Sequence, residues 1–296
     1  MEDVRPEGVQ KVPSDRAGQR ALGRREHGEN FPVALRLLPA RHREALHAVY
    51  GFARTVDELG DSYPGDRTAA LRAFAADLDR IWAGHRPAHP VLQRLRPIVL
   101  DHALAAEPFQ LLVRANLQDQ TISRYRTFAD LLGYCRLSAD PVGRMVLGVF
   151  DVHDPEIALL SDRVCTALQL LEHWQDLAED RQAGRIYLPQ QDLETYAVAE
   201  ADLDNHEATP QLRALMSFEI ERAAQMLEEG TVIVSRLNGW ARVSVAGFVA
   251  GGQATVRALR RTGGDVLARS AGSSRLDTAV RAVRLVAGAR RQAVAR

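Results

Sequence analysis

The sequence predicts an all-α fold built as a single domain, and three observations predict it. From about residue 20 onward, apolar residues recur with the spacing of one helical face, as at Leu46, Val49, Ala53 and Val56. No segment alternates between apolar and polar residues between two hairpin turns, as the strands of a sheet would. Proline and glycine divide the chain into helix-length segments, with breaks expected at 63–65, at 84–90, near 105–108, around Gly230 and at 263–264.

The two ends of the chain differ from this helical domain, which we expect to span residues 20–270. Residues 1–19 are polar, contain proline and glycine and lack periodicity, so they predict a disordered N-terminal segment. Residues 271–296 are arginine-rich and predict a last helix or a solvated tail. The apolar residues on roughly one side of that segment are Leu276, Val280, Val283 and Val286. This pattern leaves a basic amphipathic helix on an anionic membrane surface as an alternative.

The composition narrows the class of protein. The formal net charge is +0, so nothing in it indicates a nucleic-acid partner. A chain of 296 residues that is 46% hydrophobic can bury a substantial core. The N-terminus lacks the apolar core of a secretory signal, and no uncharged apolar run approaches the roughly 20 residues of a membrane-spanning helix. We therefore expect Cys135 and Cys165 to be reduced thiols of a cytoplasmic protein, with peripheral contact to the inner face of the membrane left open. The sequence does not indicate an oligomeric state.

Two segments concentrate carboxylates in the same way, DELGD at 57–61 and DLAED at 176–180. Each has aspartates at i and i+4 and a further carboxylate between them. The first lies in a polar stripe formed by Tyr50, Arg54, Asp57, Glu58 and Asp61. The second stripe is formed by Gln169, Glu172, Asp176, Glu179 and Asp180. We expect the second helix to open at Asp154-Pro155-Glu156, to run through DLAED and to stop near Gly184.

Like charges one helical turn apart repel each other, so each stripe needs an explanation. For either segment alone, a solvated helix face is the ordinary interpretation. Both stripes, however, lie in strongly apolar helices, where an ionised carboxylate needs a partner. Mg²⁺ takes oxygen ligands and commonly links one or two carboxylates to a substrate phosphate. Two such stripes facing each other across a bundle predict several Mg²⁺ ions that hold a polyphosphate. Arg54 and Arg185 are the candidates for contacting it.

These residues resemble the motifs of the squalene/phytoene synthase family. The resemblance runs from about His27 to about Arg269, and its motifs are ENFPVALRLLP at 29–39, YGFARTVDELGD at 50–61, YCRLSADPVGRMVLGVF at 134–150 and LQLLEHWQDLAEDRQAGRIYLPQQDL at 168–193. Late segments, FEIERAAQMLEEG at 218–230 and VAGGQATVRAL at 249–259, are also similar. The resemblance implies an isoprenoid-synthase helical bundle around a central apolar cavity.

Within that family, ENFP and HWQD followed by GRIYLPQ look most like the bacterial hopanoid-pathway branch. The resemblance implies release of diphosphate from presqualene diphosphate and formation of hydroxysqualene or squalene, with Mg²⁺ as cofactor and a prenyl diphosphate as partner. Head-to-head condensation of two prenyl diphosphates, such as farnesyl diphosphate, to squalene or phytoene is the alternative. A non-catalytic family member that binds or assembles is the alternative from another class.

The resemblance also implies roles for individual residues. Asp57, Asp61, Asp176 and Asp180 are expected as magnesium ligands and catalytic residues, and Tyr134 stands where the family places a catalytic tyrosine. The expected substrate-binding residues are Tyr50, Arg54, Gln175, Arg185, Tyr187 and Arg222. For Arg222 a structural buried ion pair, and for the tyrosines a place at the edge of the core, are the alternatives.

Two positions depart from the family pattern. Glu58 replaces the second aspartate of the usual first motif, with the same charge on a longer side chain. Glu172 stands where the family usually has asparagine, so a neutral amide becomes a further carboxylate of the second stripe. We expect both glutamates among the metal ligands, although Glu172 could also displace an ion.

Overall fold

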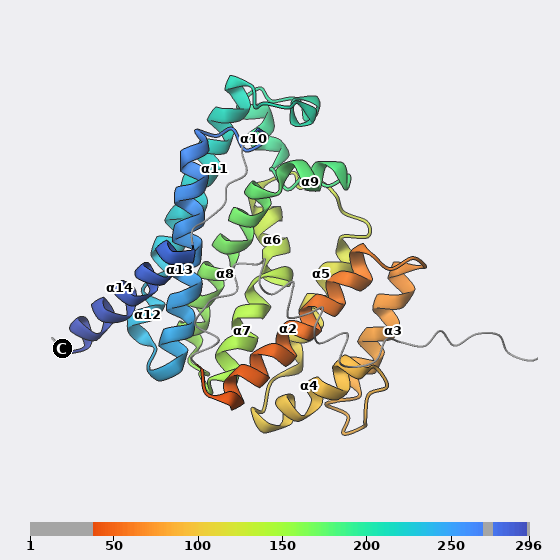
Figure 1. The fold of residues 1–296 in the computed structure, drawn as a ribbon. Helices are drawn as coiled ribbons and strands as arrows, with labels where there is room; N and C mark the ends of the chain where they lie inside the picture. The colour runs from red at the N-terminus through yellow and green to blue at the C-terminus, as the bar shows by residue number, and fades with distance from the viewer. Residues whose placement is uncertain (1–37, 269–274, 295–296) are drawn as a thin grey trace, which may run out of the picture. The chain divides into compact units, whose positions relative to one another are not determined.

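The computed structural model describes residues 38–268 and 275–294, so the predicted disordered segment 1–19 lies outside the described residues. The prediction of an all-α fold is confirmed (Figure 1). Within the described ranges the only β-type pairing is one isolated parallel bridge between Arg124 and Ile186. The helices are α2 (Ala40–Asp61), α3 (Arg67–Asp79), α4 (Pro90–Asp101), α5 (Ala106–Gln118), α6 (Phe128–Ser138), α7 (Asp140–Val149), α8 (Pro155–Gln175), α9 (Leu177–Gln182), α10 (Gln190–Thr195), the 3₁₀ helix η2 (Glu200–Asp204), α11 (Pro210–Gly230), α12 (Ile233–Arg236), α13 (Gly239–Thr262) and α14 (Arg275–Val294).

Local sequence signals set several helix ends. The Asp154 side chain accepts a hydrogen bond from the Glu156 N–H at 2.8 Å, and Pro155 occupies the first turn of α8, as predicted. Thr127 and Asp130 form a reciprocal capping box that starts α6. At the end of α13, Gly263 adopts a left-handed conformation with φ 63°, which suits a residue without a Cβ. The breaks predicted from proline and glycine therefore lie where the helices end.

One predicted helix is interrupted. The segment expected to continue through DLAED instead breaks at Asp176, where φ is −98° and ψ is 15°, and resumes as α9. Arg181 of α9 donates hydrogen bonds to Asp204 at 2.8 Å and to Glu200 at 3.2 Å, both on η2. These charge-assisted bonds favour a separate short helix that lies against η2 over continuation of α8. The second stripe is therefore divided between two helices.

Buried apolar side chains form two clusters that share the bundle. One cluster surrounds α8 and includes fully buried Trp174, with residues from α6, α11 and α13 packed around it. The other joins α2, α3, α4, α5 and α7 around Phe52 and Phe109, whose rings meet edge-on at 5.1 Å. Such aromatic pairs contribute about 0.5–1.5 kcal/mol beyond the area that they bury. The two acidic segments thus belong to helices anchored in different parts of the core.

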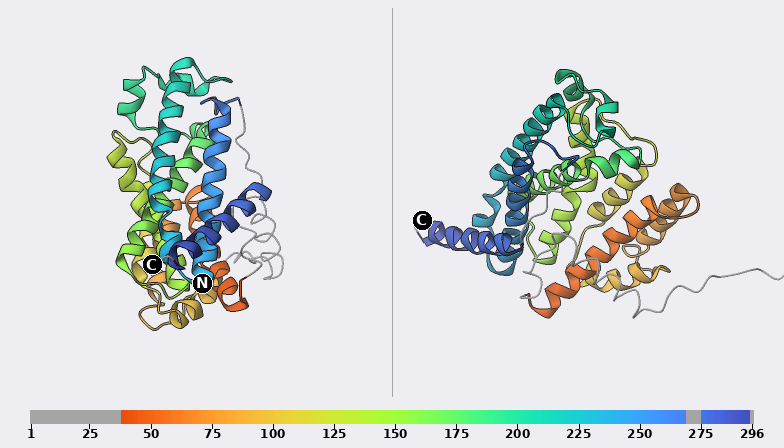
Figure 2. Two further views of the ribbon diagram at one scale, coloured as in Figure 1. Left: turned by 90° about the vertical axis from the view of Figure 1, so that its left-hand side faces the viewer. Right: turned by 45° about the horizontal axis from the view of Figure 1, so that its top comes forward.

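The arginine-rich segment forms α14, which crosses α13 and also contacts α12 (Figures 1 and 2). Its apolar residues do not all share one environment. Val283 is 70% exposed, whereas Leu285, Val286 and Ala289 pack against the α8 cluster. In the described part of the chain, no helix has both the length and the apolar character needed to cross a bilayer.

Candidate active site

The C-terminal end of α2 and the segment after α9 meet through a direct ion pair. Arg185 donates a hydrogen bond from Nη2 to Asp61 Oδ1 at 2.7 Å. The Arg185 backbone N–H also bonds to the Asp180 carbonyl at 2.8 Å, after Gly184 turns the chain with φ +83°. Burial acts to lower the pKa of Arg185, but the bond to Asp61 and the nearby Tyr187 and Asp119 raise it overall. This arginine therefore carries its positive charge between the two acidic segments.

Helix α5 approaches α2 beside the first acidic segment. Asn116 of α5 donates from Nδ2 to Asp57 Oδ1 at 3.3 Å. A Cβ at Gly60 would collide with the Asn116 side chain, so glycine at this position leaves room for the Asn116 amide beside Asp57. Gln120 adds a hydrogen bond to the Gly60 carbonyl at 3.1 Å. Together these contacts fix the α2 carboxylates relative to the end of α5.

Asp119, directly after α5, connects the acids to the predicted catalytic tyrosine. The Tyr134 hydroxyl donates to Asp119 Oδ2 at 2.7 Å. The other oxygen, Oδ1, is buried and has no hydrogen-bond partner among the described residues. Burial raises the pKa of Asp119 to about 6 even though the Tyr134 hydrogen bond and Arg185 oppose that rise. Asp119 is thus a desolvated carboxyl group next to a phenol.

Aromatic rings gather behind this pair. Tyr134 lies 5.5 Å from Tyr125 and 5.6 Å from Tyr187, between ring centroids. The His173 ring stacks on Tyr187 with centroids 3.6 Å apart and an interplanar angle of 14°. Burial is the first cause that raises the pKa of Tyr125, Tyr134 and Tyr187, so all three phenols stay neutral. The arrangement offers neutral π faces beside an acidic cluster.

His173 also fixes the second acidic segment. Its Nδ1 lies 3.5 Å from Asp180 Oδ2, and its Nε2 lies 3.2 Å from Gln169 Nε2. Burial lowers the pKa of His173, which favours the neutral ring. Burial, followed by the repulsion of Glu179 and Asp180, raises the pKa of Asp176 to about 6. The carboxylates after α8 are therefore closely spaced and partly desolvated.

The other predicted site residues of the two stripes differ in their exposure to solvent. Arg54 and Glu58 form an i,i+4 pair at 3.5 Å, and the Glu58 side chain is 51% exposed. Tyr50 on α2 and Gln175 at the end of α8 are half-buried, while Glu172 is exposed. The structure thus gathers six predicted site residues in one region: Asp57, Asp61, Tyr134, Asp180, Arg185 and Tyr187. Direct contacts link Arg185 to Asp61, Asn116 to Asp57, Asp119 to Tyr134, and Tyr187 through His173 to Asp180. The charge of Arg185 also acts on Asp119.

Arg222 belongs to a second cluster. It donates to Asp192 at 3.0 Å and lies 3.5 Å from Glu219. Its guanidinium is held over the rings of Phe128, at 4.0 Å, and Phe218, at 4.4 Å. These contacts are those of a buried ion pair, the structural alternative raised from the sequence.

The chemistry of the donor set fits a divalent cation. Within the described ranges, no three His, Cys, Asp or Glu side chains surround a common point. That is compatible with Mg²⁺, which keeps several waters and is usually bound by one or two carboxylates plus phosphate oxygens. Burial is the first cause that raises the pKa of Asp119 and of Asp176 to about 6, so a cation close to either group would favour its ionised form. Arg185 already acts in that direction on Asp119.

Sequence patterns missed Asp119, Asn116 and His173. Asp119 and Asn116 lie at the end of an ordinary amphipathic helix, and no spacing distinguishes them from surface polar residues. His173 sits within the HWQD motif, but a lone histidine in an apolar helix gives no sign of its partner. Their contacts join residues far apart in the chain and become visible only in the folded structure.

Comparisons with known proteins point to one family. A family model described as squalene/phytoene synthase matches residues 24–281. A phytoene synthase from Arthrospira platensis is 31% identical over 241 residues, covering 74% of this chain and 78% of the relative. A hydroxysqualene synthase from Zymomonas mobilis is 32% identical over 215 residues, covering 71% of each.

Solved structures agree as well. Squalene synthase HpnC from Alicyclobacillus acidocaldarius aligns with a TM-score of 0.76 at 40% identity, covering 85% of this chain and 97% of that one. A dehydrosqualene synthase aligns with a TM-score of 0.79 over 95% of this chain and 99% of its own, and its 24% identity supports the fold alone. The resemblance predicted from the motifs is confirmed, and the chain belongs to the squalene/phytoene synthase family of isoprenoid-synthesising enzymes.

Proposed function

We propose that this enzyme ionises presqualene diphosphate in a Mg²⁺-dependent reaction and releases diphosphate. Water captures the rearranged cation to give hydroxysqualene, or a hydride donor such as NADPH reduces it to squalene. The observation that carries the proposal is that Asp61 forms an ion pair with Arg185, whose charge acts on Asp119, and that Asp119 accepts a hydrogen bond from Tyr134. It puts carboxylates and an arginine suited to a metal-bound diphosphate directly beside neutral aromatic rings. Ionisation of an allylic or cyclopropylcarbinyl diphosphate needs both in one place.

The metal would be held by the two acidic segments. Asp57 and Asp61 of α2 would be its ligands, together with Asp176 and Asp180 after α8, and Glu58 and Glu172 would be additional ligands. Bound Mg²⁺ would neutralise the charge that develops on the departing diphosphate oxygens. Asn116 and His173 orient Asp57 and Asp180, respectively, since each contacts one of these carboxylates.

Arg185 and Arg54 would bind the diphosphate itself. A guanidinium matches phosphate oxygens with two parallel hydrogen bonds. Both arginines are already paired with carboxylates, Arg185 with Asp61 and Arg54 with Glu58, so each is held in place before substrate arrives. Tyr50 and Gln175 are proposed to line the same site, whereas we assign Arg222 a structural role.

Tyr134, Tyr187 and Tyr125 would surround the hydrocarbon part of the substrate. Once diphosphate leaves, a carbocation must be kept from bulk water and stabilised by π faces. Asp119 accepts a hydrogen bond from the Tyr134 hydroxyl at 2.7 Å, and this bond keeps the phenol in a single orientation. Its position next to the cation makes Tyr134 the residue that we expect to influence the fate of the intermediate.

A product assay tests the proposal. The enzyme is incubated with Mg²⁺ and either presqualene diphosphate or farnesyl diphosphate, with and without NADPH as hydride donor, and products are identified by mass spectrometry. Hydroxysqualene or squalene from presqualene diphosphate supports the proposal. Condensation products from prenyl diphosphates alone would favour the second candidate, a head-to-head squalene or phytoene synthase, which the 31% identical phytoene synthase supports.

The assay also separates an enzyme from a non-catalytic binding or assembly protein. Asp57→Asn and Asp176→Asn variants serve as controls, since each should abolish Mg²⁺-stimulated pyrophosphate release without unfolding the bundle. If the wild-type enzyme releases no pyrophosphate from any C15 to C30 diphosphate, the proposed reaction is wrong.

A further inference from the structure

Arg124, in the segment between α5 and α6, contacts the turn that carries Arg185. Its Nη1 donates hydrogen bonds to the Gly184 carbonyl at 2.7 Å and to the Ser123 carbonyl at 2.8 Å. Its Nε and Nη2 donate to the two carboxylate oxygens of Glu200 on η2, at 2.8 and 3.0 Å. All three guanidinium nitrogens are therefore used within the protein, so the role of Arg124 is to hold other groups rather than to bind substrate.

Backbone hydrogen bonds support the same turn at Arg185 and at the residue after it. The Ile186 N–H donates to the Ser123 carbonyl at 3.0 Å, within the isolated parallel bridge between Arg124 and Ile186. The Arg185 N–H donates to the Asp180 carbonyl at 2.8 Å. The segment of Arg124 is therefore the direct neighbour of the chain that follows Arg185.

The ion pair between Arg124 and Glu200 favours a single geometry. Two parallel hydrogen bonds between a guanidinium and a carboxylate fix the orientation of both groups and are stronger than bonds between neutral groups. The hydrogen bond from Arg124 is the first cause that lowers the pKa of Glu200, so this carboxylate is ionised at neutral pH. Arg181 adds a bond to Glu200 at 3.2 Å and donates to both oxygens of Asp204 at 2.8 Å. The Arg124 side chain, which is 26% exposed, is thus fixed by charged partners.

The turn itself needs such support. Gly184 is exposed and has φ +83°, a conformation that costs glycine little but that glycine also leaves easily. We propose that Arg124 is a positioning residue for Arg185: its bond to the Gly184 carbonyl holds the turn so that the Arg185 guanidinium is in place for diphosphate. The inference rests on the proposed function, in which Arg185 binds the diphosphate. A group that is ordered before binding spares the complex the entropy of ordering it.

The test measures the affinity for inorganic pyrophosphate by calorimetry without Mg²⁺. Arg185→Gln should lose about 10- to 100-fold, because it removes charge-assisted hydrogen bonds to phosphate oxygens. Arg124→Gln should lose about tenfold, because the guanidinium at position 185 must then be ordered during binding. In the Arg185→Gln background, replacing Arg124 should change the affinity by less than about twofold, since Arg124 acts through Arg185. Losses that multiply in the double variant would overturn the inference.

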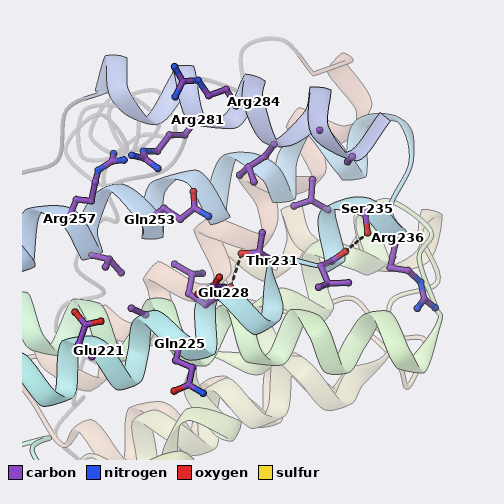
Figure 3. Close-up of a pocket in the computed structure, with 18 of the residues that line it drawn as sticks. Glu221, Gln225, Glu228, Thr231, Ser235, Arg236, Gln253, Arg257, Arg281 and Arg284 are labelled. Atoms are coloured by element: carbon purple, nitrogen blue, oxygen red, sulfur yellow. Dashed lines mark hydrogen bonds between the residues drawn. The ribbon is translucent and has the colours of Figure 1, made fainter. Parts of the chain in front are cut away.

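A neutral variant separates position from charge. Arg124→Gln/Glu200→Gln keeps the net charge and should still lose about tenfold, because the bond to the Gly184 carbonyl is gone. The matched control is the pair of Arg260 and Glu221, which uses the same atoms at 2.7 and 2.6 Å. It lies at a groove between α11, α12, α13 and α14, away from the turn (Figure 3).

The control variant Arg260→Gln/Glu221→Gln should keep its pyrophosphate affinity within about twofold of the wild type, because this pair does not touch the turn. Thermal melts of both neutral variants show how much stability each pair contributes. Normal binding by Arg124→Gln/Glu200→Gln, or an equal loss of affinity in the control, would overturn the inference.

The binding test and the product assay can fail separately, because either candidate reaction releases diphosphate. Coupling between positions 124 and 185, with no product from presqualene diphosphate, would support the inference and refute the proposed reaction. Hydroxysqualene or squalene formation with independent losses at the two positions would refute the inference alone. Normal pyrophosphate binding by Arg185→Gln would overturn the inference together with the role proposed for Arg185.

Discussion

Replacing Asp119 with asparagine should lower turnover and raise thermal stability together. Asparagine keeps the size and an acceptor oxygen for the Tyr134 hydroxyl, but it removes the buried negative charge. Replacing a residue with a purely structural role would lower both activity and stability. Opposite changes would identify a carboxylate that is kept for function at a cost in stability.

The structure sets the size of both effects. A hydrogen bond to a charged group contributes about 1.5–3 kcal/mol, which corresponds to roughly 10- to 100-fold in kcat if Tyr134 depends on it. Burial raises the pKa of Asp119 from 3.8 to about 6, a difference of about 2 units. At about 1.4 kcal/mol per unit, ionising this group costs the fold roughly 3 kcal/mol at neutral pH. Allowing about 1 kcal/mol for the weaker bond to Tyr134, the variant should gain roughly 2 kcal/mol, or about 4–8 °C in Tm.

The sign of the pH dependence follows from the raised pKa. Below pH 4 the carboxyl group is protonated in both folded and unfolded chains, so Asp119 carries no penalty there. The penalty grows as pH rises to about 6 and is constant above it. The Tm gain of Asp119→Asn should therefore appear between pH 4 and pH 6 and hold at pH 7.

The assay is steady-state pyrophosphate release with Mg²⁺, alongside thermal melts, for Asp119→Asn, Tyr134→Phe and the double variant. Because Asp119 acts through the Tyr134 hydroxyl, the double variant should be no slower than Tyr134→Phe alone. If the two losses in kcat multiply, or if Asp119→Asn lowers Tm at pH 7, Asp119 does not have the positioning role assigned to it.

Three further predictions concern charge and packing. Asp61→Asn should reduce Mg²⁺-dependent turnover. It should also tighten the binding of pyrophosphate without Mg²⁺ several-fold, because Arg185 loses its ion pair with Asp61. Calorimetry measures this affinity, and an unchanged value would contradict the prediction. Glu219→Gln should leave Tm unchanged near pH 4.5 and raise it progressively up to pH 8, because burial raises the pKa of this carboxyl group to about 8. A Tm difference between variant and wild type that is constant across that range would disprove the prediction. Gly60→Ala should lower the free energy of unfolding by about 1–3 kcal/mol and weaken substrate binding by pushing α5 from α2. Gly51→Ala, with open space around its Cβ, should leave this free energy unchanged or raise it. Equal Tm values for the two variants would refute the packing argument.

Periodicity and acid spacing predicted the parts of the site that depend on local structure. Asp57 and Asp61 are one turn apart on α2, so their common face follows from the helix alone. Arg185 was predicted from its position next to the second motif, and it contacts the first. Local rules also placed the helix ends at Asp154 and Gly263. Each of these features is determined within a few residues of sequence.

Features that depend on tertiary contacts could not be predicted. The break at Asp176 follows from bonds between Arg181 and η2, which the stripe pattern does not contain. Asp119 becomes part of the site only because α5 ends beside α6 and presents its carboxylate to Tyr134. In α14, the sequence placed Val283 with Val286 on one side, yet Val283 faces solvent, because contact with α13 selects a slightly rotated face. Helical periodicity identifies a stripe but not the neighbour that it meets.

The repulsion between carboxylates is handled differently in the two acidic segments of the folded protein, whereas the sequence predicted one explanation for both. A bound cation was expected to offset all of it, but Arg185 already neutralises Asp61. Asp176 instead lies beside Glu179 and Asp180, and burial followed by the repulsion of these two carboxylates raises its pKa to about 6. The two segments are therefore unequal before any ligand binds. The first presents a carboxylate paired with an arginine, whereas the second presents one that is partly buried beside like charges. If Arg185 binds the diphosphate as proposed, it exchanges Asp61 for phosphate oxygens, and this exchange would free the α2 carboxylate for a cation only when diphosphate is present. Binding of the two ligands would then be coupled through a single side chain.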